Sequence, residues 1–268
     1  VGQAQTCPRT TLPGGRNARR PRKMNEKKDT PPTAERPVRP ARTLILLTYN
    51  EIEGATKLCG RIPWDCADEA FVVDGGSTDG TLEFLNSKGI RVIKQDRRGR
   101  GRAFAIGAGA AKGEHLVFFS LDGNEDPADI PKLFAELDNG SDMAIASRMM
   151  KGAYNEEDAQ LLRLRKWVNN ACTLAVNFMW NRGSYVTDTI NGFRGVKKSS
   201  FLRLKAATDR FDIEFLMSIR AMKLGLKISE FPTREGTRIG GVSTAESLPT
   251  GILFIKRLWT EIRLGYNF

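Results

Sequence analysis

A short apolar segment that ends in a cluster of acidic residues is the feature that most constrains this chain. Residues Leu116–Leu121 read L-V-F-F-S-L, which has the length and the aromatic content of a buried strand. The next residues, Asp122–Pro127, read D-G-N-E-D-P. Parallel sheets of α/β proteins bind their ligands just beyond the carboxyl ends of the strands, so we expect this acidic turn at a functional site.

Three side chains of the turn carry oxygen atoms at alternate positions: Asp122, Asn124 and Asp126. Such oxygen ligands suit a hard divalent cation, Mg²⁺ or Mn²⁺. The alternative is an ordinary strand-to-helix turn, in which Asp126 and Pro127 only open the next helix. Acidic turns are common in loops, so the turn by itself does not decide between the two interpretations.

Strands and helices alternate along most of the chain, which predicts an α/β fold with a doubly wound, mainly parallel sheet and helices on both faces. The expected strands are Thr43–Thr48, Ala70–Val73, Ile90–Ile93, Leu116–Leu121, Asp142–Ala146 and Ile228–Phe231. Two amphipathic helices are also expected, at Leu161–Trp180 and Ile252–Leu264.

A glycine-rich segment with four arginines follows the third expected strand. A dinucleotide-binding fingerprint would need a glycine where Phe104 stands, and a Walker loop would need Gly-Lys-Ser/Thr, so neither motif is present. The small residues favour a closely packed helix, and arginines near its start suit a diphosphate, with a solvated basic turn as the alternative. The arginines are Arg97, Arg98, Arg100 and Arg102.

Residue counts exclude several kinds of active site. His115 is the only histidine, and the four cysteines lack the spacing of metal ligands. A histidine-based zinc site, a Ser-His-Asp triad and a Cys-His pair are therefore not expected, and acid–base chemistry must fall to carboxylates. The cysteine usage fits a reducing cytoplasm, and the sequence contains no apolar run near 18 residues.

The positive charge is concentrated at the start of the chain. Residues 1–43 hold 11 Lys and Arg, 3 Asp and Glu and seven of the twelve prolines, whereas the whole chain has a net charge of +11. We expect a disordered basic tail at 1–42, a catalytic domain at 43–245 and a terminal amphipathic helix at 246–268. A non-enzymatic alternative is nucleic-acid binding through the tail, although no specific nucleic acid is expected.

Six segments, taken in order, resemble motifs of the family-2 glycosyltransferases, which have the GT-A fold, and within them the branch of polyprenyl- and dolichyl-phosphate sugar synthases. Three residues depart from the pattern: Leu47 stands where a proline is usual, Gly75 replaces the second aspartate of Asp-Asp-Gly-Ser, and Asn124 replaces the second aspartate of Asp-x-Asp. The segments are Leu47–Glu51, Val73–Thr81, Arg97–Gly107, Asp122–Asn124, Ala146–Arg148 and Asp188–Arg194.

The resemblance implies a metal-dependent, inverting enzyme that moves a single sugar from a UDP- or GDP-linked nucleotide-sugar donor. It implies Thr48 and Tyr49 at the base, Glu51 at the ribose and Asp74 on the N–H edge of the base. Further donor contacts are expected from Arg102 and Asp122, and the implied metal ligands are Asp122, Asn124 and Asp126.

The acceptor side leaves two chemical alternatives. A saccharide hydroxyl needs a general base, for which Asp188 is the best candidate. A lipid phosphate such as polyprenyl phosphate is already ionised and needs arginines instead; Arg148, Arg194 and Arg238 are expected to serve it. We favour the phosphate. A sugar-1-phosphate nucleotidyltransferase is a weaker alternative, because it would want a glycine-rich basic loop where Thr48–Glu51 stands.

A lipid acceptor also suggests contact with a membrane. We expect Leu161–Trp180 or Ile252–Leu264 to lie at the bilayer surface, which would make the protein cytoplasmic and peripheral on the cytoplasmic face of the membrane. The alternative is that both helices only cover the core. The identity of the sugar and the oligomeric state are not predicted.

Overall fold

The computed structural model describes residues 39–154, 164–240 and 247–268, with the side chains of 164–166 and 247–249 left aside. Residues Arg39–Phe268 belong to one compact unit. The expected tail lies outside the described residues except for its last four. Of these, Arg39 pairs with Asp68 at 2.9 Å and Arg42 starts the first strand, so this end of the expected tail is part of the folded unit.

A seven-stranded mixed sheet forms the centre of the unit, in the order β3-β2-β1-β4-β6-β5-β7. All neighbouring strands are parallel except β6, which runs antiparallel to both β4 and β5. The predicted, mainly parallel sheet is therefore confirmed. The strands are β1 (Arg42–Thr48), β2 (Glu69–Asp74), β3 (Val92–Lys94), β4 (His115–Ser120), β5 (Met143–Ser147), β6 (Arg194–Lys197) and β7 (Ile228–Pro232).

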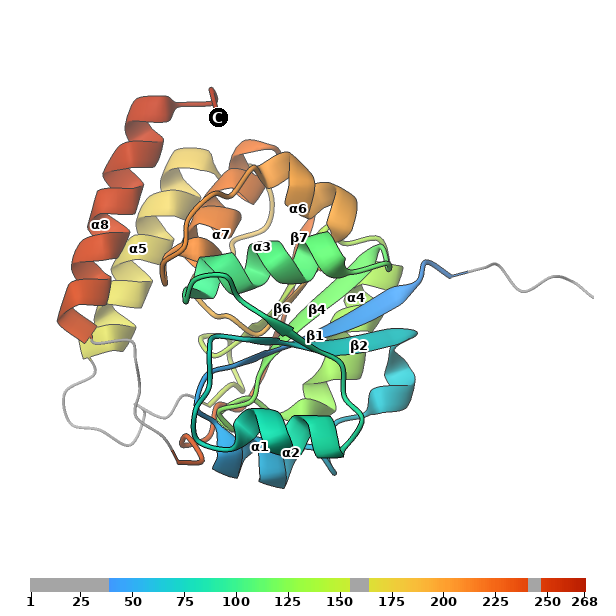
Figure 1. The fold of residues 1–268 in the computed structure, drawn as a ribbon. Coiled ribbons are helices and arrows are strands. Elements are labelled where there is room, and N and C mark those ends of the chain that lie inside the picture. Colours follow the sequence, from blue (N-terminus) through green and yellow to red (C-terminus); the bar gives the residue numbers. More distant parts are fainter. Residues whose placement is uncertain (1–38, 155–163, 241–246) are drawn as a thin grey trace, which may run out of the picture. The chain divides into compact units, whose positions relative to one another are not determined.

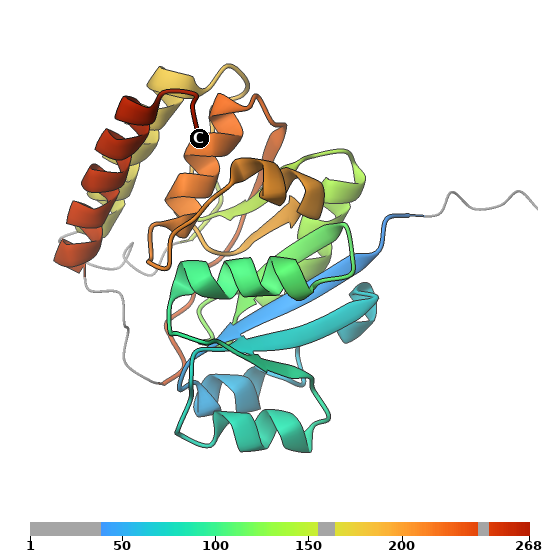
Figure 2. The ribbon, with the colours of Figure 1, turned by 45° about the horizontal axis from the view of Figure 1, so that its top comes forward.

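Helices cover both faces of the sheet, as predicted (Figures 1 and 2). Strand residues alternate between two apolar cores: Ile45 of β1 belongs to one core and Leu46 to the other. One core is completed by α1, α2 and α4, and the other by α3 and α5 to α8. The helices are α1 (Ile52–Leu58), α2 (Thr81–Ser87), α3 (Arg100–Ala110), α4 (Ile130–Asp138), α5 (Leu164–Trp180), α6 (Lys198–Leu204), α7 (Ile213–Lys223) and α8 (Ser247–Leu264).

Helix α3 lies close to the central strands because of its small residues. A Cβ atom on Gly107 would stand 2.7 Å from Cγ2 of Ile45, so only glycine allows this approach. On the same helix, Phe104 stacks on Phe118 of β4 with ring centroids 4.1 Å apart. The prediction of a closely packed helix is confirmed.

The sequence did not predict strand β6, and this strand shapes the functional edge of the sheet. It is only four residues long, and it follows a polar loop instead of a helix. Because β6 is antiparallel to its neighbours, it starts at the edge where the parallel strands end. The loop that precedes it, Thr187–Phe193, is therefore brought to the same edge as the acidic turn after β4. The third strand is also shifted, to Val92–Lys94.

Helices α5 and α8 lie side by side in both ribbon views (Figures 1 and 2). Both helices carry large apolar side chains that are exposed. The apolar side of the predicted last helix faces outward. Phe254 and Leu258, on its other side, pack on the core. Residues 161–163 of the expected helix lie outside the described residues. The most exposed large apolar side chains of these helices are Trp167, Leu174 and Phe178 on α5 and Ile252, Ile255, Trp259 and Ile262 on α8.

Candidate functional site

The acidic turn follows β4 at the carboxyl edge of the sheet and is held by a later segment, Thr233–Gly240, which we call the strap. The backbone N–H of Gly236 donates to the carbonyl of Asn124 at 2.8 Å, and that of Ile239 donates to the carbonyl of Asp122 at 2.8 Å. Between them, Gly123 has a φ of +89°, and a Cβ atom there would collide with Ile239. The strap and the acidic turn thus pack closely against each other and are joined by two backbone hydrogen bonds.

The turn has the oxygen atoms that a hard cation needs. Oδ1 of Asn124 is buried without a partner, while its Nδ2 donates to Glu235 at 3.2 Å. Burial and neighbouring carboxylates raise the pKa of Asp122 and raise that of Glu125 well above its usual value. Within the described ranges, no three His, Cys, Asp or Glu side chains converge on a complete metal site. Mg²⁺ commonly uses one or two carboxylates plus substrate phosphates, so Asp122 and Asn124 fit it.

Asp126 acts as a helix cap, whereas the expectation was that it completes a metal site. Its side chain accepts a hydrogen bond from the N–H of Ala128 at 3.1 Å and caps the short 3₁₀ helix Pro127–Asp129. Arg61 lies 3.9 Å from the same carboxylate. The ordinary capping interpretation therefore holds for this residue, because the proline that follows fixes the start of a helix. Glu125 and Glu235 are the acids beside Asp122.

Polar atoms without partners gather at the end of β1. Among the described residues, five buried side-chain nitrogen or oxygen atoms have no partner, and three of them are Thr48 Oγ1, Glu51 Oε2 and Asn124 Oδ1. Buried polar groups normally have partners, so unpaired atoms on adjacent strand ends indicate a ligand that supplies them. Thr48 and Glu51, which the resemblance assigns to the donor, lie at the end of β1, next to the end of β4 that carries the acidic turn.

Asp74 holds the turn after β2 and is not free to contact a base. It is fully buried, and its carboxylate accepts from the N–H of Gly76 at 2.7 Å and from both the N–H and the hydroxyl of Ser77. An aspartate at the end of a strand commonly satisfies the backbone of the next residues in this way. The structure therefore gives Asp74 a supporting position, in place of the expected direct contact.

Tyr49 and Arg98 form a wall beside this end of the sheet. The Arg98 guanidinium lies 4.0 Å from the centre of the Tyr49 ring. A Cβ atom on Gly75 would be 3.2 Å from the same tyrosine, so a side chain at this position would require the tyrosine to shift by a few tenths of an ångström. Arg102 differs from the expectation: it pairs with Asp96 at 2.7 Å.

The other arginines of this cluster also have carboxylate partners. Arg97 pairs with Asp209 at 2.8 Å, and Arg100 pairs with the buried Glu214. In the part of the chain that the structure describes, Arg98 has none, so its charge is available to a ligand.

Asp188 lies in the loop before β6 and is fully buried. Its carboxylate accepts from the Arg148 Nε at 2.8 Å, from the Asn169 side chain at 3.2 Å and from the N–H of Asn191 at 3.1 Å. Despite the burial, the charge of Arg148 and these hydrogen bonds lower the pKa of Asp188 to about 2. Such a carboxylate is a weak base whose oxygens are already in use. It orients Arg148, in contrast to the catalytic base that was predicted.

Arg194 is a structural residue, which corrects its prediction as an acceptor ligand. Its side chain is fully buried, and it donates to the carbonyl of Asn191 at 2.8 Å, to that of Glu214 at 3.0 Å and to the hydroxyl of Ser218 at 3.1 Å. Burial lowers its pKa to about 10, so it stays charged at neutral pH. Sequence reasoning did not separate it from Arg148, because both are arginines next to a strand.

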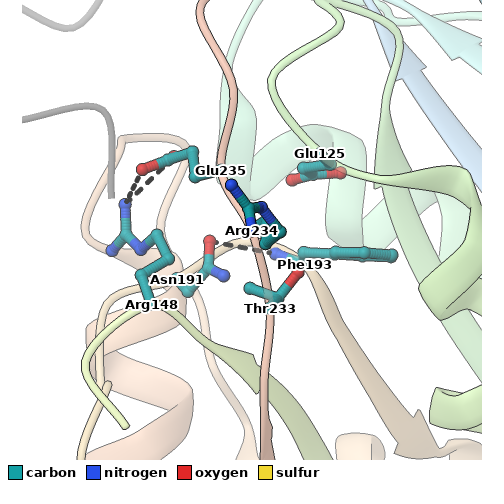
Figure 3. Close-up of a pocket in the computed structure, with 7 residues that line it drawn as sticks. All are labelled: Glu125, Arg148, Asn191, Phe193, Thr233, Arg234 and Glu235. Atoms are coloured by element: carbon teal, nitrogen blue, oxygen red, sulfur yellow. Dashed lines mark hydrogen bonds and ion pairs between the residues drawn. The ribbon is translucent and has the colours of Figure 1, made fainter. Parts of the chain in front are cut away.

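A small pocket opens between the acidic turn, the loop before β6 and the strap (Figure 3). Within it, Glu235 links the two sides of the site: it accepts from Arg148 at 3.3 Å and from Asn124 at 3.2 Å. Glu235 was missed at the sequence level, because it stands in a polar loop without a distinctive motif. The pocket is lined by Glu125, Arg148, Asn191, Phe193, Thr233, Arg234 and Glu235.

Arg238, expected beside the acceptor, instead lies across the donor side. Its guanidinium pairs with Glu51 and contacts Asp122 at 3.4 Å. The three arginines that were predicted to meet around an acceptor are therefore separated: Arg148 lines the pocket, Arg194 is buried beneath it and Arg238 covers the acids of the acidic turn and the β1 end.

Residues 43–204 match the glycosyl transferase family 2. Glycosyltransferase AglJ of Haloferax volcanii is 30% identical over 209 residues, covering 75% of this chain and 65% of that protein. Dolichol-phosphate mannosyltransferase of Pyrococcus furiosus is 30% identical over 209 residues, covering 75% of this chain and 58% of that protein. The chain spans less than two thirds of the length of these two relatives. Polyprenol monophosphomannose synthase of Mycolicibacterium smegmatis is 28% identical, covering 77% and 82%.

Solved structures with the same fold include glucosyl-3-phosphoglycerate synthase from Mycobacterium tuberculosis. Its complex with Mn²⁺ and uridine-diphosphate-glucose has a TM-score of 0.63 at 20% identity, covering 82% of this chain and 78% of that one. A complex of the same enzyme with Mg²⁺ and uridine-diphosphate has a TM-score of 0.60. The predicted GT-A fold is confirmed.

Proposed function

The chain belongs to glycosyl transferase family 2, and on that premise we propose that it moves a single sugar from a UDP- or GDP-linked donor to polyprenyl phosphate or another phosphate-bearing acceptor. The observation that carries the choice of acceptor is the state of Asp188, which is buried, fully hydrogen-bonded and has a pKa lowered to about 2. A hydroxyl acceptor needs a base, and this carboxylate cannot supply one efficiently.

A phosphate acceptor needs cationic contacts instead, because it is ionised near neutral pH with a second pKa of about 6. Arg148 and Arg234 both line the pocket beside the acidic turn. Asp188 holds Arg148 in a fixed orientation, which suits the recognition of phosphate by a guanidinium. Two relatives named for polyprenol or dolichol phosphate support the same acceptor class.

The donor is proposed to lie over the ends of β1, β2 and β4. Glu51 Oε2 would accept a hydrogen bond from the nucleoside, and the Thr48 hydroxyl would donate or accept one. Arg98 on Tyr49 would contact the nucleotide in place of Arg102. Asp122 and Asn124 would hold a divalent cation. When bound, such a cation neutralises charge on the departing nucleoside diphosphate.

We also propose direct displacement, which inverts the configuration at the anomeric carbon. A double displacement would require a free carboxylate as nucleophile. At the pocket, the Asp188 carboxylate is fully engaged, and the Glu125 carboxylate accepts from the N–H of Ser120 at 2.7 Å.

A transfer assay with purified protein tests this function. UDP-glucose and GDP-mannose would be offered with Mn²⁺ and either a polyprenyl phosphate or the corresponding polyprenol, which has a hydroxyl in place of the phosphate. We expect a sugar-phosphate lipid from the phosphate acceptor, and no transfer in EDTA. Transfer to the polyprenol or to a saccharide at an equal or higher rate would contradict the proposed acceptor.

The outer face of α5 and α8 is proposed to rest on the membrane surface, where such a lipid acceptor resides. Phe178 is 90% exposed and Trp167 74%, whereas Glu261 of α8 points inward to Arg220 and Lys223. Lys256 and Arg263 are the exposed charges among the described side chains of α8, which suits anionic headgroups. On the inner side of α5, the buried Asn169 reaches Asp188, so this helix itself adjoins the proposed acceptor side.

None of the helices in the described ranges combines the length and apolar character needed to cross a membrane. The test of the surface contact is flotation with liposomes. Wild-type protein is expected to float with vesicles that contain anionic lipid. The double variant Phe178→Ser, Trp259→Ser is expected to stay in the bottom fraction of the gradient. Equal flotation of both proteins would reject the proposed face.

A further inference from the structure

Arg238 places a positive charge between two carboxylates of the proposed donor site. Its guanidinium spans two carboxylates that come from different strands, Glu51 after β1 and Asp122 after β4. Glu51 is 6% exposed and Asp122 belongs to the acidic turn, so the ion pairs are largely shielded from water. In such surroundings, an uncompensated carboxylate is costly, and an internal cation stabilises both acids.

The strap keeps Arg238 at this position through its backbone. The N–H groups of Gly236 and Ile239 bind the carbonyls of the acidic turn, and the Arg238 Nε donates to the carbonyl of Gly240 at 3.1 Å. The arginine is therefore tied to the same turn whose side chains face the donor. The two backbone hydrogen bonds therefore link the acidic turn to the segment that carries Arg238.

Arg238 nevertheless leaves the acids incompletely paired. Its contact with Asp122 is 3.4 Å long, and Glu51 Oε2 remains buried without a partner. A guanidinium at 3.4 Å forms a weaker hydrogen bond than one at the 2.7–2.9 Å usual for charged pairs. This arrangement can be exchanged for a better-matched ligand.

We propose that Arg238 is an internal counter-ion of the donor site, which a divalent cation displaces from Asp122 and which then turns to the donor diphosphate. The inference rests on the proposed function, since it assumes a metal-bound nucleotide. The inference assigns Arg238 to the donor side. It predicts that removing the arginine changes the affinities for the cation and for the nucleotide in opposite directions. Removing the arginine should strengthen binding of the cation alone and weaken binding of the nucleotide diphosphate.

The experiment measures Mn²⁺ binding by electron paramagnetic resonance, which reports free Mn²⁺ and does not depend on catalysis. Wild type, Arg238→Ala and Arg238→Lys are compared without nucleotide, and thermal melting verifies that each is folded. Arg91→Ala is the control, because it removes the same charge but pairs with Glu69 at 3.2 Å, at the start of β2 and so at the opposite edge of the sheet. We expect Arg238→Ala to bind Mn²⁺ on the order of tenfold more tightly, with Arg238→Lys between the two and Arg91→Ala unchanged.

UDP and GDP are then titrated calorimetrically at saturating Mn²⁺. Arg238→Ala is expected to lose about tenfold in affinity for the nucleotide that wild type prefers, because a charge-assisted contact to the diphosphate is lost. Unchanged or weaker Mn²⁺ binding by Arg238→Ala, in a wild-type protein that binds Mn²⁺ and nucleotide, would overturn this inference alone. Failure of wild type to bind either ligand would overturn the proposed function as well.

Discussion

The two halves of the functional edge differ in how completely their polar groups are paired. In the donor half, formed by the ends of β1 to β4, Thr48, Glu51 and Asn124 each keep a buried atom without a partner. In the acceptor half, formed by β5, β6 and β7, Asp188 and Arg194 are buried and fully engaged. The donor half therefore depends on a ligand for its completion, whereas the acceptor half is organised in advance.

This difference indicates where substitutions affect binding and where they affect structure. A buried polar network that is complete gives rigidity, and removing one member leaves its neighbours unpaired. Atoms without partners have the opposite meaning, because their burial is costly until a ligand pairs with them. Substitutions in the donor half should thus change ligand affinity, and those in the acceptor half should also lower stability.

The largest effect is expected from the acidic turn. Asp122→Ala should reduce sugar transfer by at least about 10³-fold and remove the dependence of nucleotide binding on Mn²⁺, since a preorganised charge at the departing diphosphate is lost. Asp126→Ala is the matched control, because it removes a carboxylate of the same turn that only caps Pro127–Asp129. Its transfer rate should fall far less. Equal loss in both variants would remove the distinction between the two aspartates.

Arg148 should come next. Arg148→Ala is expected to slow transfer to a lipid phosphate by about 10²–10³-fold and to lower stability by about 3 kcal/mol, because it leaves Asp188 buried without its counter-charge. Arg148→Lys keeps the charge but not the paired N–H groups, and should recover stability better than activity. The measurements are transfer rates and urea denaturation. A variant with normal rates and reduced stability would limit Arg148 to a structural role.

Much of the fold could be predicted, because buried parallel strands are continuous apolar segments. The strand Leu116–Leu121 and the acidic turn after it were recognisable for this reason. Strand β6 was not, because its four residues follow a loop and pair antiparallel. The edge positions of Asp122 and Asp188 followed from the family motifs, whereas the partners of each residue did not. Whether Arg194 or Arg148 faces the pocket depends on tertiary contacts with Glu214 and Ser218, far along the chain.

A moderate effect on donor binding is expected from Arg98 of the glycine-rich segment, and a smaller one from Arg102. Arg98→Ala should raise the KM for the nucleotide-sugar about tenfold, because Arg98 has no carboxylate partner in the described ranges and lies on Tyr49. Arg102→Ala should change it less, since Arg102 is paired with Asp96 at 2.7 Å. The two substitutions remove the same charge, four residues apart around the start of α3. A larger effect at Arg102 would return the donor contact to the residue that the family motif first indicated.

The smallest effect concerns acid stability and follows from Asp188. Its folded-state pKa of about 2 lies below the ordinary value of 3.8, so its charged form stabilises the fold. The stabilisation is complete above the unfolded-state pKa and is lost as the pH falls from about 4 towards 2. At about 1.4 kcal/mol per pKa unit, it amounts to about 2 kcal/mol. Urea denaturation of wild type should therefore become easier across this window, whereas Asp188→Asn should start lower and lose this part of the slope. Identical slopes would mean that Asp188 does not carry its charge in the folded protein, and the acceptor half would then be less completely paired than the contrast with the donor half requires.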